Sequence, residues 1–119
     1  MVEQPILAPG LLGPLRCHEQ PGDRDGVHRP GAYCVRGVLG TLPPFGDCLY
    51  YTEVGETLRQ ALNAWILTNK DVNGLIDFDR VLRDPTNPKM FDPRYDSGDQ
   101  LHPNDAGYAA MAESVRLVL

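Results

Sequence analysis

The chain has 119 residues, of which 42% are hydrophobic, so it is long enough for one small domain with its own core. The formal net charge of −5 excludes a typical nucleic-acid or polyanion binder, because no basic stripe is available to neutralise phosphates. No apolar stretch approaches the length of a transmembrane helix, and the first residues lack the basic start and apolar run of a signal peptide.

Residues 1–36 are predicted to be irregular. They contain five prolines and five glycines, and these breakers leave no window long enough for a helix. Cysteines and histidines in this segment suggest a zinc site, but their spacing matches no standard ligand pattern, so no metal site is predicted: Cys17, His18, His28 and Cys34. The three cysteines of the chain cannot all pair within it, so they form no disulfide framework.

From residue 37 onward the pattern is that of an ordered α/β unit. Residues 37–42 are a short apolar run that ends at two prolines, which is typical of a buried parallel strand. Thr52 precedes an amphipathic helix that Asn73-Gly74 ends, and residues 75–79 follow as a second strand. This order predicts a right-handed βαβ unit. The apolar face of the helix is expected to pack in the core: Val54, Leu58, Ala61, Leu62, Trp65 and Ile66.

The run Asp-Ser-Gly-Asp-Gln-Leu-His-Pro-Asn-Asp-Ala-Gly-Tyr at residues 96–108 is the strongest functional signal in the sequence. It places Asp99 three residues before His102. The carboxylate can accept a hydrogen bond from the imidazole ring, fix its tautomer and stabilise the imidazolium that forms when His102 takes a proton. The pattern predicts that His102 is a catalytic base and that Asp99 orients it.

The context of this pair distinguishes it from a chance occurrence. Asp25 and His28 repeat the spacing, but no helical pattern follows them. After His102, by contrast, Asn104 is the expected N-cap of a last helix, which would hold the loop in place. The residues after it recur at helical spacing: Tyr108, Met111, Ala112, Val115 and Val118.

In combination, these segments resemble the C-terminal part of the SGNH (GDSL-type) hydrolases, a family of esterases and lipases. Thr41-Leu-Pro-Pro-Phe45 is similar to the strand end and Thr-x-x-Pro-Phe loop of the family, and residues 75–85 are similar to its strand and acidic segment ahead of the catalytic loop. Asp99 and His102 match the Asp-x-x-His residues of the family. Because the resemblance covers roughly residues 37–119, the chain is expected to divide into an irregular segment, 1–36, and an SGNH-like part, 37–119.

This resemblance implies an α/β fold, the flavodoxin-like three-layer α/β/α arrangement, of which the chain would supply the C-terminal βαβα half. It implies ester hydrolysis by a Ser-His-Asp triad, with no metal and no organic cofactor. The implied substrate is an ester of a small molecule, a carbohydrate or a lipid. An extracellular location is suggested only by the company that such hydrolases keep.

The chain departs from the family in its nucleophile. The serine of the family lies in an N-terminal Gly-Asp-Ser motif, and its oxyanion hole also uses a Gly and an Asn from two further blocks. The only serines here are Ser97, too close to Asp99 in the same loop, and Ser114, inside the last helix. Gly46-Asp47-Cys48-Leu49 places a cysteine in a similar motif, but in a late block of the family, so Cys48 is expected to be a structural or exposed free cysteine.

Two functional hypotheses follow from this departure. In the first, the chain is the C-terminal part of an ester hydrolase, carries the base of the triad and needs a nucleophile half supplied from elsewhere, so that it is inactive alone. In the second, it is a non-catalytic remnant or binding module that keeps the C-terminal half of the fold for interaction. Because half of a doubly wound sheet has an open strand edge, self-association through strand 38–42 or 75–79 is also expected.

Overall fold

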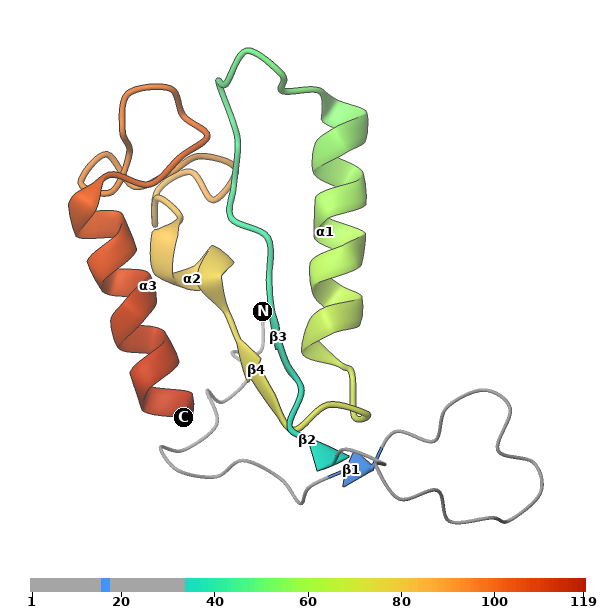
Figure 1. Ribbon diagram of the computed structural model, residues 1–119. Coiled ribbons are helices and arrows are strands. Elements are labelled where there is room, and N and C mark those ends of the chain that lie inside the picture. Colours follow the sequence, from blue (N-terminus) through green and yellow to red (C-terminus); the bar gives the residue numbers. More distant parts are fainter. Residues whose placement is uncertain (1–15, 18–33) are drawn as a thin grey trace.

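The computed structural model describes residues 16–17 and 34–119 (Figure 1). Strand β1 (Arg16–Cys17) pairs antiparallel with β2 (Cys34–Val35) just before the main α/β unit begins. Most of the segment predicted to be irregular lies outside the described residues. The same is true of the two histidines in the suggested zinc set, His18 and His28.

The predicted βαβ unit is confirmed. Strand β3 (Val38–Gly40) leads to helix α1 (Glu53–Leu67) and then to β4 (Gly74–Ile76). The two strands pair in parallel, with Val38 opposite Gly74 and Gly40 opposite Ile76. In Figure 1, α1 lies on one side of this strand pair and α3 (Asp105–Val118) lies on the other. The chain therefore has the partial α/β fold that the sequence predicts.

Each strand of this parallel pair has one edge that no other strand of the described chain covers. Within residues 34–119, β3 and β4 form a two-stranded sheet and pair only with each other. Each strand contributes three residues to the ladder. The self-association expected through these edges stays a prediction.

The predicted second strand is too long, because its last residues begin a helix instead. Strand β4 ends at Ile76, and helix α2 (Phe78–Leu82) follows at once. The side chain of Asp77 caps this helix by accepting a hydrogen bond of 3.1 Å from the backbone N–H of Arg80. Apolar and acidic residues alternate at 75–79, and this pattern fits a strand end followed by a helix N-cap as well as it fits a continuous strand. The structure has the strand end and the N-cap.

Helix α1 begins where the sequence predicts but ends earlier. The hydroxyl of Thr52 accepts a hydrogen bond of 2.9 Å from the N–H of Gly55, which confirms Thr52 as the N-cap. The helix ends at Leu67, ahead of the predicted Asn73-Gly74 break. At this end the Thr68 hydroxyl donates to the carbonyl of Ala64 at 2.9 Å.

The prediction that the apolar face of α1 packs in the core is wrong for most of its residues. Four of them are exposed to 72%, 64%, 42% and 57%: Val54, Leu58, Leu62 and Trp65. The face that is buried against the rest of the described chain carries mainly polar side chains: Glu56, Arg59 and Asn63, with Ile66 at its C-terminal end. The helix is thus held by its polar side.

The polar side of α1 is buried because it satisfies the backbone where β3 ends. Asn63 accepts a hydrogen bond of 2.8 Å from the N–H of Leu42, and its amide donates to the carbonyl of Leu42 at 2.9 Å. Arg59 Nη1 donates to the same carbonyl at 3.1 Å. The side-chain amide of Asn63 thus bonds to the backbone of Leu42 as a neighbouring strand would. Both the N–H and the carbonyl of Leu42 therefore have hydrogen-bond partners.

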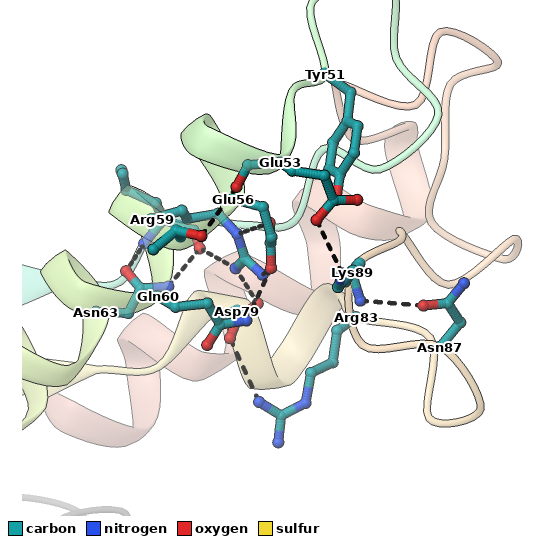
Figure 2. Close-up of polar contacts among 12 residues, drawn as sticks. Tyr51, Glu53, Glu56, Arg59, Gln60, Asn63, Asp79, Arg83, Asn87 and Lys89 are labelled. Atoms are coloured by element: carbon teal, nitrogen blue, oxygen red, sulfur yellow. Dashed lines mark hydrogen bonds and ion pairs between the residues drawn. The ribbon is translucent and has the colours of Figure 1, made fainter.

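Arg59 also forms the centre of a buried charge cluster with Glu56 and Asp79 (Figure 2). Its Nη2 lies 2.7 Å from Glu56 Oε1, and its Nη1 lies 2.6 Å from Asp79 Oδ1. Burial raises the pKa of Asp79 above its usual value, and the neighbouring Arg59 offsets this only in part. Burial acts on Glu56 in the same direction, but hydrogen bonds from Arg59 and Gln60 leave its pKa below the usual value. The cluster joins α1 to α2 by paired charges.

Most of the apolar core lies on the side of the sheet that α3 covers, away from α1. Leu82 of α2 is fully buried, and helices α2 and α3 pack against each other. Ile66 is the contribution of α1 to the buried apolar residues. The others in the described chain are Pro44, Cys48, Ile76, Leu82, Phe91 and Val118. None of the helices in the described part of the chain has the length and apolar content that crossing a bilayer requires.

Candidate functional site

The segment that carries Asp99 and His102 is a loop between the irregular stretch after α2 and the first turn of α3. Figure 1 shows this loop at the end of the molecule toward which β3 and β4 run. In open parallel α/β sheets, ligands bind beyond the carboxyl ends of the strands. The loop is therefore on the side of the sheet where a site is expected.

Local hydrogen bonds shape the tip of the loop. Oδ1 of Asp96 accepts hydrogen bonds of 3.0 Å from the N–H groups of both Gly98 and Gln100. Gly98 has a φ of 113°, a conformation that glycine adopts without a Cβ penalty. Gln100, with a φ of 55°, also takes the left-handed region. The aspartate therefore organises the turn that brings the next residues into place.

The base of the loop is closed by Asn104. Its backbone N–H donates to the carbonyl of Tyr95 at 2.8 Å, and its side-chain amide donates to the carbonyls of Arg94 and Asp96 at 2.9 and 3.2 Å. Its side-chain oxygen accepts from the N–H of Gly107 at 2.9 Å, which confirms it as the N-cap of α3. One residue thus joins the two ends of the loop to the helix.

The carboxylate of Asp99 is held by the ring of His102 and by three further hydrogen-bond donors. Nδ1 of His102 lies 2.6 Å from Oδ2 of Asp99. The other oxygen, Oδ1, accepts from the N–H of His102 at 2.8 Å, from the N–H of Leu101 at 2.9 Å and from the Ser97 hydroxyl at 2.9 Å. The hydrogen bond from the His102 ring, helped by those backbone N–H groups, holds the pKa of Asp99 far below its usual value.

The ionised state of Asp99 determines the tautomer of His102. A carboxylate only accepts hydrogen bonds, so Nδ1 of the ring carries the proton and Nε2 has the free lone pair of a neutral imidazole. The His102 side chain is 64% exposed, and Nε2 makes no hydrogen bond to the described residues. The pair can therefore accept a proton at Nε2 from a group that approaches from outside, while Asp99 stabilises the resulting imidazolium.

The other residues considered from the sequence are not brought to Nε2. The Ser97 hydroxyl donates to Asp99, and the Ser114 hydroxyl donates to the carbonyl of Met111 at 2.6 Å within α3. Cys48 is a buried free cysteine, and no hydrogen bond joins it to His102. Within the part of the chain that the structure describes, no group of three or more His, Cys, Asp or Glu side chains is arranged to hold a metal ion.

Sequence reasoning missed the supporting roles of Ser97 and Asn104. Ser97 was considered only as a nucleophile, although its hydroxyl orients the carboxylate of Asp99. Asn104 was expected as an N-cap, but its amide also ties together the two sides of the loop. The turn-forming composition Asp-Ser-Gly-Asp was the available signal, because such residues hydrogen-bond to backbone groups two or three positions away.

Gly107 makes the close contact of α3 with this loop possible. A Cβ at this position would lie 2.8 Å from both Pro103 Cβ and the carbonyl oxygen of Tyr95. We expect Gly107→Ala to lower the free energy of unfolding by about 1–3 kcal/mol, because backbone atoms of the loop must move. Thermal unfolding measures this loss. The control is Gly37→Ala, where a Cβ meets nothing within 4 Å; an equal effect of both variants would contradict the argument.

Comparison with known families gives one match. The sequence model described as GDSL-like Lipase/Acylhydrolase matches residues 27–115, which is most of the chain. No curated protein is similar enough to this chain to count as a relative. The matched range includes every element from β2 to most of α3, together with the loop that carries Asp99 and His102.

Proposed function

Because this chain belongs to the GDSL-like lipase/acylhydrolase family, we propose that it provides the acid–base part of an ester-hydrolysing site. In this proposal His102 is the general base and Asp99 orients it. Membership of this family supports acyl-ester hydrolysis as the general activity, with small-molecule esters as substrates. The geometry of the loop supports the roles of His102 as base and of Asp99 as the residue that orients it.

The observation that carries the proposal is the hydrogen bond of 2.6 Å between His102 Nδ1 and an Asp99 carboxylate whose pKa is lowered. In the proposed reaction, Nε2 of His102 removes the proton from a serine hydroxyl as its oxygen attacks the ester carbonyl. The imidazolium then gives this proton to the departing alkoxide, which leaves as an alcohol. Water hydrolyses the acyl-enzyme in a second round with the same base.

We further propose that the nucleophile is neither of the two serines in this sequence. The Ser97 hydroxyl is engaged with the carboxylate that must orient His102, on the Nδ1 side of the ring. The Ser114 hydroxyl bonds to the backbone of its own helix. A serine from a further polypeptide segment would have to reach the exposed Nε2. The substrate would be an ester of a small molecule, a carbohydrate or a lipid.

A second candidate function is a non-catalytic binding module with the same fold. It is favoured by the observation that neither serine hydroxyl donates to His102. The two candidates differ in one respect: a chain that lacks only its nucleophile gains activity when a serine is supplied, whereas a binding module does not.

The missing nucleophile leads to a prediction for the isolated chain. We expect it to hydrolyse p-nitrophenyl acetate no faster than its His102→Ala variant, because a base without a positioned serine has nothing to activate. We also expect a fluorophosphonate probe to leave both serines unlabelled in intact-mass measurements. Stoichiometric labelling of Ser97 or Ser114 would show that the nucleophile is present after all.

A further inference from the structure

Helix α1 has an apolar face that the rest of the described chain leaves uncovered. We call this face the α1 stripe and define it by five exposed residues: Val54, Leu58, Ala61, Leu62 and Trp65. The helix is anchored through the opposite side, where Arg59 and Asn63 are buried. With 100° per residue, the centre of the α1 stripe lies roughly 140° around the helix from the direction of Arg59 and Asn63. The stripe is therefore not an incompletely packed part of the core but a separate surface.

The spacing along the stripe is that of a helix–helix seam. Val54, Leu58, Ala61 and Trp65 follow one another at intervals of four, three and four residues, which is the spacing of the two apolar positions in a heptad. Leu62 widens the seam on one side. Such a pattern fits another helix rather than a flat surface or an extended peptide.

The sizes of these four side chains make the seam complementary to itself in the antiparallel direction. If two copies align about a two-fold axis through the middle of the seam, Trp65 of one copy faces the small Val54 of the other. Leu58 likewise faces Ala61. Every facing pair then contains one larger and one smaller side chain, which fills the interface evenly. In a parallel pair, Trp65 would face a second Trp65 and Ala61 a second Ala61, which would leave one contact overfilled and another empty.

We propose that the α1 stripe is a homodimer interface, in which the α1 helices of two copies of this chain pack antiparallel. Charge does not oppose this contact, although the chain has a formal net charge of −5. On one flank of the seam, Glu53 is the only charged residue of α1, and the other positions are uncharged: Thr57, Gln60 and Ala64. The charged side chains of α1 itself are paired within the chain, Glu53 with Lys89 and Arg59 with Glu56. The dipoles of antiparallel helices also oppose each other favourably.

The exposed area sets the expected strength of this dimer. At roughly 100–200 Å² for a large apolar side chain, the exposed fractions of Val54, Leu58, Leu62 and Trp65 sum to about 350 Å² per copy. A standard stable interface buries about 800 Å² per partner. The dimer is therefore a weak one that forms and dissociates with protein concentration, and the test must cover a wide concentration range.

Trp65 is the only tryptophan in the chain, so its fluorescence reports directly on the stripe. We expect its emission maximum to shift to shorter wavelength as the concentration of the full chain rises, in parallel with a monomer–dimer transition in sedimentation. Exposed emission without association at any concentration would overturn the proposal. So would a short-wavelength emission that does not depend on concentration, because another part of the same chain would then cover the stripe.

A charge in the seam should abolish the dimer. Leu58→Asp is expected to raise the dissociation constant by about a hundredfold or more, because the two-fold axis places the change in the contact twice. The control Ala112→Asp puts the same charge on the exposed side of α3 and should leave association unchanged. Association that persists in Leu58→Asp would assign it to an open strand edge instead and overturn the proposal.

A double variant tests the antiparallel register. In that register position 58 faces position 61 of the other copy, so Leu58→Glu combined with Ala61→Lys creates two pairs of opposite charge across the interface. We expect this variant to associate more tightly than Leu58→Glu alone, and to lose this gain at high salt. Equal association of the two variants would exclude the antiparallel arrangement, because a parallel pair places like charges opposite each other.

Discussion

Replacing Arg59 with methionine is expected to lower the free energy of unfolding by about 3–5 kcal/mol, the usual cost of removing one partner of a buried charge pair. Methionine keeps most of the aliphatic volume of arginine, so the loss reflects charge more than a cavity. Glu56 would remain buried without its cation, and Asp79 would keep only the longer contact of 3.4 Å with Arg83. The carbonyl of Leu42 would also lose one of its two side-chain donors. Urea unfolding followed by circular dichroism measures the change.

The control for this variant is Arg116→Met. Arg116 pairs with Glu113 at the same three-residue spacing as Arg59 with Glu56, but on the exposed surface of α3. Exposed pairs contribute about 0–1 kcal/mol, so this variant should unfold almost like the original chain. Similar losses in both variants would mean that the buried cluster contributes no more than a surface pair.

The cost of Arg59→Met should depend on pH. Without the cation, burial raises the pKa of Glu56 in the folded state above its value in the unfolded chain. The pKa of Asp79, already raised in the original chain, rises further, because only Arg83 at 3.4 Å still offsets its burial. The folded variant then binds more protons than the unfolded one, so its stability rises as the pH falls. The difference from the original chain should therefore shrink between about pH 7 and pH 4. A difference that stays constant over this range would contradict the explanation by buried charge.

The second large effect is expected when the proposed missing nucleophile is supplied. We expect co-expression of the full chain with the N-terminal half of another GDSL-type hydrolase, which carries its serine and oxyanion donors, to give hydrolysis of p-nitrophenyl acetate. His102→Ala should then lower kcat by about 10⁶-fold and Asp99→Asn by about 10⁴-fold, as in other serine triads. The matched control is His28→Ala, which removes the histidine of the other Asp-x-x-His pair.

The outcome separates the two candidate functions. Activity that survives His102→Ala would show that the added half works without this chain. Absence of activity from a complex that forms stably would favour the binding module. Measurement of complex formation by sedimentation is therefore part of the experiment.

The sequence was sufficient for features that depend on short-range chemistry. Thr52 and Asn104 were predictable as N-caps because a hydroxyl or amide just before an apolar periodic run satisfies free N–H groups at a helix start. The parallel βαβ order followed from the sequence of apolar runs and breakers. The proximity of Asp99 and His102 was predictable for the same reason, since three residues of one loop separate them.

The face that α1 buries could not be predicted in this way. Periodicity identifies an apolar stripe but not the surface that covers it, and burial of the stripe is only the most common solution. Arg59 finds its partners at Leu42 and Asp79, 17 and 20 residues away, and Asn63 finds Leu42 at 21. Such long-range pairing depends on the tertiary structure, so the polar anchoring of this helix has no local signature.

The anchoring of α1 through Asn63 and Arg59 has a consequence for how this surface can evolve. In most amphipathic helices the apolar side holds the fold together, so a mutation there is removed by selection against unfolding. Here the side chains that fix the helix are Asn63, Arg59 and Glu56. Substitutions at Leu58 or Trp65 cost the monomer little, and that face can drift, or adapt to a new partner, while the loop around His102 stays intact.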